Sequence, residues 1–266
     1  MTETEIRRKL ADVRCFMLDM DGTFYLGDQL LEGSLSFLER LSETGRTNLF
    51  LTNNSSKSAE VYVNKLRRMG VEDQYCNVLT SGQAAGSWCL REMPGKKAFL
   101  LGNHMLRSEL EGMGLLFDDK NPDYVLVGYD TTLDYAKMTA LCDHVRAGLP
   151  YIATHPDFNC PTETGFAPDI GAIMAFVEAS TGRRPDRIIG KPNVGIVEEA
   201  LKKTGLEPHQ LAMVGDRLYT DIATGRNFGI LSILVLTGEA SMDDVEKSDV
   251  KPDLIFPRLS SMNHLL

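Results

Sequence analysis

Short apolar runs and amphipathic helical stretches alternate along almost the whole chain. Near its start, an apolar run at 13–19 precedes a helical stretch at 34–44 and a second apolar run at 48–52, and the same order returns between 187 and 238. Alternating strands and helices predict a parallel sheet with helices on both faces, which is a doubly wound α/β fold. Ligands of such sheets bind at the carboxyl ends of the strands.

The middle of the chain contains a strand and helix series of its own, with apolar runs at 97–102 and 123–129. One open sheet holding every run would need about ten strands, and open sheets rarely grow that large. We therefore predict an inserted α/β cap domain at 81–185. Residues 1–80 and 186–266 would form one discontinuous, Rossmann-like core, and a single long sheet is the alternative.

Composition narrows the classes of partner and the cellular setting. The 266 residues carry a net charge of −9 and no run of Lys or Arg, so we expect no nucleic-acid partner. The polar opening lacks the apolar core of a signal peptide, and no apolar run approaches the ~20 residues of a membrane span. Five cysteines without a C-x-x-C pair argue against structural zinc and favour a cytoplasmic setting. A homodimer is left open.

Two carboxylates follow the first apolar run, in the stretch CFMLDMDGTFYLGD at 15–28. Side chains alternate along a strand, so Asp19 and Asp21 start out on the same side, and their like charges need a cation or a shared proton. A calcium loop counted from Asp19 would need glycine at Phe24 and glutamate at Leu30. An EF-hand is therefore excluded.

Three other predicted strand ends also carry polar clusters. Thr52–Asn54 lie in LTNN, Lys191 lies in IIGKP, and Asp216 and Asp221 lie in GDRLYTD. Each has a simpler interpretation: a capped helix start, a solvated lysine, a turn aspartate or a helix N-cap. Together, however, they combine acids for Mg²⁺ with hydroxyl, amide and ammonium groups for a phosphate.

The four clusters resemble, in order, the motifs of the haloacid dehalogenase-like superfamily of aspartyl-phosphate hydrolases. DMDGT is similar to motif I, LTNN to motif II, GKP to motif III and GDRLYTD to motif IV. Longer stretches around these motifs resemble the class IIA, NagD-like branch, including the cap between motifs II and III. The resemblance covers nearly the whole chain.

The resemblance implies a role for each acidic residue of the core. Asp19 would be the nucleophile and Asp21 the general acid/base. Mg²⁺ would be held by the Asp19 carboxylate, the Asp21 backbone carbonyl and Asp216, with Asp221 supporting them from outside the ligand set.

The same resemblance implies that Thr52, Asn53, Asn54 and Lys191 bind the phosphate. The expected activity is that of a Mg²⁺-dependent phosphatase, which hydrolyses a small phosphorylated metabolite such as a sugar phosphate through an aspartyl-phosphate. A phosphotransferase or phosphomutase of the same superfamily is one alternative, and a catalytically silent phosphometabolite-binding protein is another.

The segment 153–171 is rich in Pro, Thr, Asn and Gly, which predicts a loop. In related caps this loop contacts the leaving group, so we expect Asn159 to contact the substrate, with His155 or Asp157 as alternatives. A solvated connector is the simpler interpretation. Asp169 stands where many related caps have glycine; its charge would exclude some anionic substrates, or it would cap the following helix.

We expect Asn159→Ala to change substrate discrimination and to spare the phosphoryl chemistry of the core, because only a leaving-group contact is lost. Rates measured across a panel of phosphorylated metabolites should change their ranking, while hydrolysis of an activated aryl phosphate persists. Equal changes for every substrate would contradict a leaving-group role.

Overall fold

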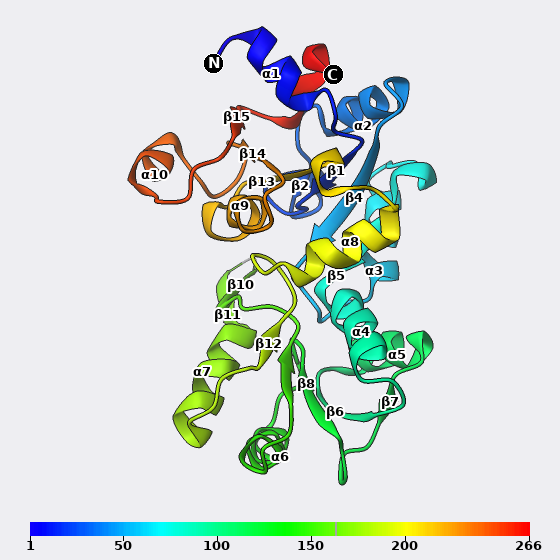
Figure 1. The fold of residues 1–266 in the computed structure, drawn as a ribbon, viewed down its shortest axis with the longest axis vertical. Helices are drawn as coiled ribbons and strands as arrows, with labels where there is room; N and C mark the ends of the chain where they lie inside the picture. Colours follow the sequence, from blue (N-terminus) through cyan, green and yellow to red (C-terminus); the bar gives the residue numbers. More distant parts are fainter. Residues whose placement is uncertain (163) are drawn as a thin grey trace. The chain divides into compact units, whose positions relative to one another are not determined.

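The computed structural model describes residues 1–162 and 164–266, and the chain forms two α/β units (Figure 1). The first unit comprises Met1–Thr52, Glu60–Leu79 and Ala200–Leu266, and the second comprises Asn53–Ala59 and Thr80–Glu199. The predicted fold class is confirmed. The second unit takes in more of the chain than the 81–185 predicted for the cap, and those domain boundaries stay a prediction.

A six-stranded sheet forms the centre of the first unit, in the order β15-β14-β13-β1-β4-β5. The pairs from β15 to β4 are parallel. β1 lies between β13 and β4, so its carboxyl end has a neighbouring strand end on either side. The strands are β1 (Cys15–Leu18), β4 (Thr47–Thr52), β5 (Val78–Thr80), β13 (Leu211–Gly215), β14 (Leu231–Val235) and β15 (Leu254–Phe256).

Local sequence signals explain where the helices of this unit begin and end. α1 begins at a capping box in which Thr2 and Glu5 exchange hydrogen bonds. α2 buries Phe37, Leu38 and Leu41 on one face. The elements around the sheet are α1 (Glu3–Leu10), α2 (Ser34–Glu43), η1 (Asp73–Tyr75), η2 (Pro208–Gln210), η3 (Leu218–Ile222), α9 (Ala223–Phe228), α10 (Met242–Lys247), η4 (Leu259–Leu265) and the hairpin of β2 (Tyr25–Leu26) and β3 (Gln29–Leu30).

The second unit contains a five-stranded parallel sheet, in the order β12-β9-β8-β6-β7. Its strands are β6 (Lys97–Leu101), β7 (Leu116–Phe117), β8 (Tyr124–Val127), β9 (Tyr151–Ala153) and β12 (Arg187–Ile188). Its helices are α4 (Ser81–Glu92), α5 (His104–Met113), α6 (Tyr135–Arg146) and α7 (Ile170–Thr181). α3 (Ala59–Arg68) and α8 (Gly195–Thr204) each have residues in both units.

The predicted loop at 153–171 is wrong in part, because it contains an antiparallel hairpin of β10 (Asn159–Thr162) and β11 (Gly165–Pro168). The loop was predicted because this segment is rich in Pro, Thr, Asn and Gly. Proline is tolerated in strands at an edge, and a separate two-stranded hairpin consists only of edge strands.

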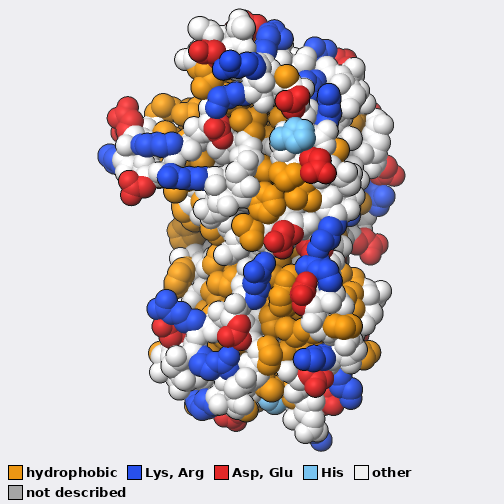
Figure 2. All heavy atoms as spheres, in the orientation of Figure 1, with side chains coloured by type: hydrophobic (Ala, Val, Ile, Leu, Met, Phe, Trp, Pro, Cys, Tyr) orange, Lys and Arg blue, Asp and Glu red, His pale blue; other side chains and the backbone are white. Residues whose placement is uncertain are grey.

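Acidic and basic side chains lie interspersed on the face of the molecule shown in Figure 2. Within the described ranges, no helix combines the length and the apolar character that a membrane crossing requires. The predicted absence of a nucleic-acid partner stays a prediction.

We expect Asp253→Ala to destabilise the first unit, because its carboxylate accepts hydrogen bonds from the backbone N–H and the hydroxyl of buried Ser232, at 3.0 and 2.9 Å. Partial burial raises the pKa of Asp253, but these bonds and Lys9 outweigh it and hold the pKa below 3.8. The stabilisation is therefore present above pH 3.8 and is lost as the pH falls through the folded-state value.

Urea denaturation would measure this effect as a decrease of about 1–2 kcal/mol in the free energy of unfolding near neutral pH. The difference between Asp253→Ala and the unmodified chain should become smaller in acid. Lys9→Met is the matched control, because an exposed ion pair contributes only about 0–1 kcal/mol. An unchanged difference between Asp253→Ala and the unmodified chain in acid would contradict the assignment.

Candidate active site

Three buried carboxylates meet at the carboxyl ends of two adjacent parallel strands. Asp19 directly follows β1 and Asp216 directly follows β13, and the backbone N–H of Asp19 donates to the carbonyl of Val214 at 2.9 Å. Asp221 joins them from η3, and one oxygen of each carboxylate lies within 4.8 Å of the others. The strand ends therefore bring together three of the acids singled out in the sequence.

The Asp216 carboxylate sits in a fitted cradle. It accepts hydrogen bonds from the Thr23 hydroxyl at 3.1 Å and from the backbone N–H of Glu239 at 2.8 Å. Gly22 and Gly238 lie directly against it, and a Cβ on either would collide with its oxygens. Asp216 can therefore occupy this position only because residues 22 and 238 are both glycine.

Asp221 lies in a π-helical turn, where one extra residue is accommodated between successive hydrogen bonds. The backbone N–H of Arg217 donates to the Asp221 carboxylate at 3.2 Å, and Gly215 lies against the same group. Asp221 therefore lies within the π-turn and is not the N-cap of a helix.

The electrostatics of this group favour a cation. Burial, followed by the charge of Asp19, raises the pKa of Asp216 to about 6. Burial lowers the pKa of the Arg217 guanidinium, but the surrounding carboxylates of Asp19, Asp221 and Asp216 raise it overall. Three acids beside one arginine leave an excess of negative charge, and an all-oxygen ligand set suits a hard divalent cation.

Asp21 is not a member of this group of three carboxylates, and its side chain is partly open to solvent. Partial burial, and then the charge of Asp19, raises the pKa of Asp21, while Lys65 opposes the shift. The Lys65 ammonium lies 4.0 Å from the centre of the Tyr25 ring. The prediction that the Asp21 backbone carbonyl binds a metal is untested.

Asn53 and Lys191, which are separated by 138 residues in the sequence, form hydrogen bonds with each other in the second unit. The Asn53 amide donates to the Lys191 carbonyl at 2.9 Å and accepts from the Lys191 backbone N–H at 2.8 Å. The same amide donates to both oxygens of Asp157 at 3.1 Å. The Asn53 side chain therefore positions the Lys191 backbone, and the phosphate contacts of both residues stay predictions.

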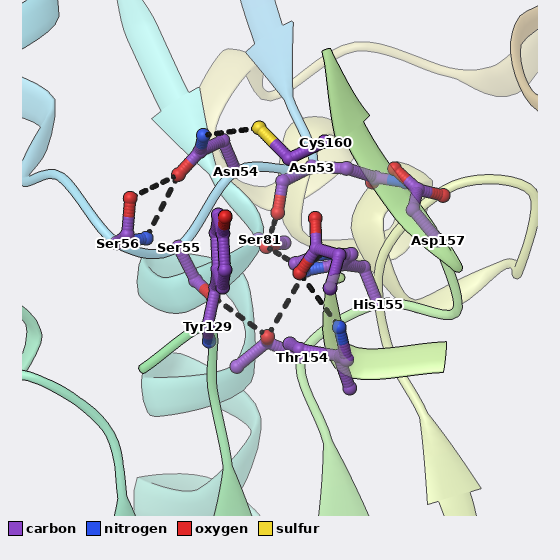
Figure 3. A network of polar contacts seen from close by, with 12 residues as sticks. Asn53, Asn54, Ser55, Ser56, Ser81, Tyr129, Thr154, His155, Asp157 and Cys160 are labelled. Carbon is purple, nitrogen blue, oxygen red and sulfur yellow. Dashed lines mark hydrogen bonds and ion pairs between the residues drawn. The ribbon is translucent and has the colours of Figure 1, made fainter. Parts of the chain in front are cut away.

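Asn54 also uses its side chain within the second unit (Figure 3). Its carbonyl oxygen accepts from the backbone N–H of Ser56 at 2.9 Å and from the Ser56 hydroxyl at 2.7 Å, and its amide donates to the sulfur of Cys160 at 3.7 Å. Thr52, the last residue of β4, belongs to the first unit and is buried. Phosphate binding by either residue stays a prediction.

The structure separates the three candidate substrate contacts of the cap. His155 is fully buried, and its two ring nitrogens face Asp169 on one side and hydroxyl groups on the other. Asp157 bonds to Asn53, whereas Asn159 is exposed at the start of β10. His155 is buried and Asn159 is exposed, so Asn159 is the more accessible of these two candidates, and substrate contacts by any of the three stay predictions.

Asp169 is the N-cap of α7, and its carboxylate accepts from the backbone N–H of Ile170 at 2.7 Å. The helix-capping alternative is therefore confirmed. The same oxygen faces the Nε2 atom of His155 at 3.1 Å.

Sequence reasoning did not assign Thr23, Arg217 or Glu239 to the site. Thr23 and Arg217 stood within the motifs DMDGT and GDRLYTD, which was a usable signal. Glu239 contributes through its backbone N–H, and no residue type advertises such a contact.

Comparison with known proteins gives two matching family models. One, described as haloacid dehalogenase-like hydrolase, matches residues 16–116, and one described as HAD-hydrolase-like matches residues 188–262. The acid sugar phosphatase of Staphylococcus aureus (strain MRSA252) is 37% identical over 248 residues, which cover 93% of this chain and 95% of that protein.

Solved structures are similar over nearly the whole chain. A 4-nitrophenylphosphatase from Thermotoga maritima is 48% identical, covers 96% of this chain and 98% of its own, and superposes with a TM-score of 0.92. NagD from Escherichia coli K-12 is 32% identical, with 93% and 97% coverage and a TM-score of 0.86. A glycerol phosphate phosphatase from Mycobacterium tuberculosis, solved in complex with magnesium, is 31% identical, with 96% and 78% coverage and a TM-score of 0.86.

We expect Gly22→Ala to be more destabilising than Gly27→Ala. Both glycines have left-handed backbone conformations, with φ of 86° and 57°, but only a Cβ at Gly22 would meet the Asp216 carboxylate. Gly27 has open space, so its variant measures the backbone cost alone, about 1–2 kcal/mol. Urea denaturation of the two variants would check this, and equal losses would show that the cradle tolerates a Cβ.

Proposed function

The chain belongs to the haloacid dehalogenase-like hydrolase family and is a phosphoric monoester hydrolase, and we propose that it hydrolyses a small phosphorylated metabolite, such as a sugar phosphate, with bound Mg²⁺. The related proteins named as an acid sugar phosphatase and a glycerol phosphate phosphatase support this class of substrate. So does the magnesium complex of the latter.

The single observation that carries the proposal is the convergence of Asp19, Asp216 and Asp221, with carboxylate oxygens within 4.8 Å. Buried like charges are costly unless an opposite charge accompanies them. Asp19 and Asp216 would hold Mg²⁺, with Asp221 beside them. Bound Mg²⁺ supplies positive charge that draws a phosphate toward these acids and offsets the charge of its oxygens.

In the proposed first step, a carboxylate oxygen of Asp19 attacks phosphorus and forms a new O–P bond, while the bond from phosphorus to the leaving oxygen breaks. Asp21 gives a proton to that oxygen. In the second step, Asp21 takes a proton from a water molecule that attacks phosphorus, and the bond between Asp19 and phosphorus breaks. Inorganic phosphate leaves and both acids are restored, so one difficult hydrolysis becomes two easier transfers.

Lys191 and Thr52 supply the remaining proposed contacts. The Lys191 ammonium would offset charge on the phosphate oxygens, and its backbone is held by the Asn53 amide. The Thr52 hydroxyl, at the carboxyl end of β4, would donate a hydrogen bond to the phosphate.

Asp19→Asn should retain the fold and lose essentially all turnover, because a neutral amide does not attack phosphorus. Release of 4-nitrophenol from 4-nitrophenyl phosphate would measure the loss, with circular dichroism as the check on folding. Asp12→Asn is a matched control, since Asp12 is an exposed aspartate of the same unit. Near-normal turnover by Asp19→Asn would refute the covalent mechanism.

Removal of divalent cations with EDTA should abolish hydrolysis, and added Mg²⁺ should restore it, with Ca²⁺ a poor substitute. Ca²⁺ prefers about 6–8 oxygen ligands in looser geometry, whereas a site built on few carboxylates suits Mg²⁺. Initial rates across a metal titration would show this. Full activity in excess chelator would remove the metal from the mechanism.

A further inference from the structure

Buried polar side chains form a connected network in the second unit, and Figure 3 shows the part of it around Ser81, Thr154 and His155. Ser81, His155 and Asp169 form its centre, and each is at most 3% exposed. The His155 Nδ1 atom lies 3.3 Å from the Ser81 hydroxyl, and the Nε2 atom lies 3.1 Å from Asp169. Carboxylates and other polar groups are costly to bury without hydrogen-bond partners. These three side chains are buried with such partners, which indicates that the network holds a part of the structure in place.

The connectivity of these three residues is that of a nucleophilic triad, but the surroundings exclude that role. Ser81 is completely buried at the start of α4, and its hydroxyl donates its one proton to the backbone carbonyl of Asn53. A hydroxyl that is committed to a carbonyl and shielded from any substrate cannot act as a nucleophile. The network instead ends on the residue that holds Lys191.

We propose that His155 is a positioning residue, which ties Asp169 at the N-terminus of α7 to Ser81 and thereby fixes the Asn53–Lys191 pair that we propose binds the phosphate. This inference rests on the proposed function. Asp169 accepts from the Nε2–H of His155 and orients the ring, and Nδ1 then accepts from the Thr154 hydroxyl at 3.2 Å, because Ser81 donates its one proton to the Asn53 carbonyl. The ring lies against the Ser81 hydroxyl, with Nδ1 at 3.3 Å, and this contact fixes the position of the hydroxyl that bonds to Asn53.

A second set of contacts joins Asn53 and the backbone at Thr154 directly to Gly190 and Lys191. The backbone N–H of Gly190 donates to the Thr154 carbonyl at 2.7 Å, and that of Lys191 donates to the Asn53 side chain at 2.8 Å. A Cβ on Gly190 would lie 2.7 Å from the Asn53 amide oxygen and 2.8 Å from the His155 Cβ. Gly190 and Lys191 are therefore packed tightly against Asn53 and His155. A displacement of His155 would displace the Lys191 backbone as well.

The test uses His155→Ala, Ser81→Ala and Asp169→Ser in the full chain. Serine is a good N-cap, so Asp169→Ser keeps the start of α7 while its shorter side chain loses His155. Val177→Ala is the matched control, because Val177 is a fully buried residue of the same helix in the apolar core. It should lower stability without touching the network.

The first readout is amide hydrogen exchange of Gly190 and Lys191, which needs no catalysis. We expect faster exchange at these two amides in the three network variants and none of this local effect in Val177→Ala. Unchanged exchange at both amides in His155→Ala and Asp169→Ser would overturn the proposal.

The second readout is the inhibition constant of inorganic phosphate against 4-nitrophenyl phosphate. It should rise about tenfold or more in the network variants, since small misplacement of a binding group is costly, and His155→Gln should recover part of the loss by reaching Asp169. Faster exchange with an unchanged inhibition constant would leave His155 as the residue that positions Lys191 and would remove Lys191 from phosphate binding, so it would overturn the phosphate role proposed for Lys191 and not the positioning role of His155.

Discussion

Mutual repulsion among buried carboxylates is the constraint around which the first unit is organised. Asp19, Asp216 and Asp221 would separate if the backbone allowed it, since like charges in a low dielectric repel strongly. They do not separate because each is attached to an element with other obligations, two to the ends of paired strands and one to a turn that leads into α9. Hydrogen bonds from Thr23, Glu239 and Arg217 then fix the oxygens. Strand pairing and hydrogen bonds thus hold the three carboxylates close together against their repulsion. The resulting group of negative charges is suited to bind a cation.

Much of this arrangement was predictable because it depends on order along the chain. Apolar runs that alternate with helices require a parallel sheet, and residues directly after such runs must gather at one edge. Asp19 and Asp216 are of this kind. The end of α2 follows a local signal as well, because glycine is common just after a helix, and Gly45 has the left-handed backbone conformation of such a position, with a φ of 68°.

What was missed depends on partners far apart in the sequence. Nothing near Asn53 indicates that its amide bonds to a lysine backbone 138 residues away. His155 was grouped with possible ligand contacts because it stands in a polar, proline-containing segment, yet its neighbours in space make it a buried residue. The hairpin of β10 and β11 was not predicted because its residues are mostly exposed and form no alternating apolar pattern that would indicate strands.

The π-helical turn at Leu218–Ile222 has a consequence for how this part of the chain tolerates changes in length. An α-helix turns by about 100° per residue, so the extra residue of a π-turn rotates everything after it by roughly that angle. In α9 this rotation brings Gly225 to face Ser232, where a Cβ would lie 2.7 Å from the serine Cβ. Loss of one residue from the turn would leave a regular helix that looks better formed, yet it would present the wrong face to the sheet and carry Asp221 away from the other two acids. The π-turn thus sets the rotation of α9 so that Asp221 can face the other two acids while Gly225 packs against Ser232.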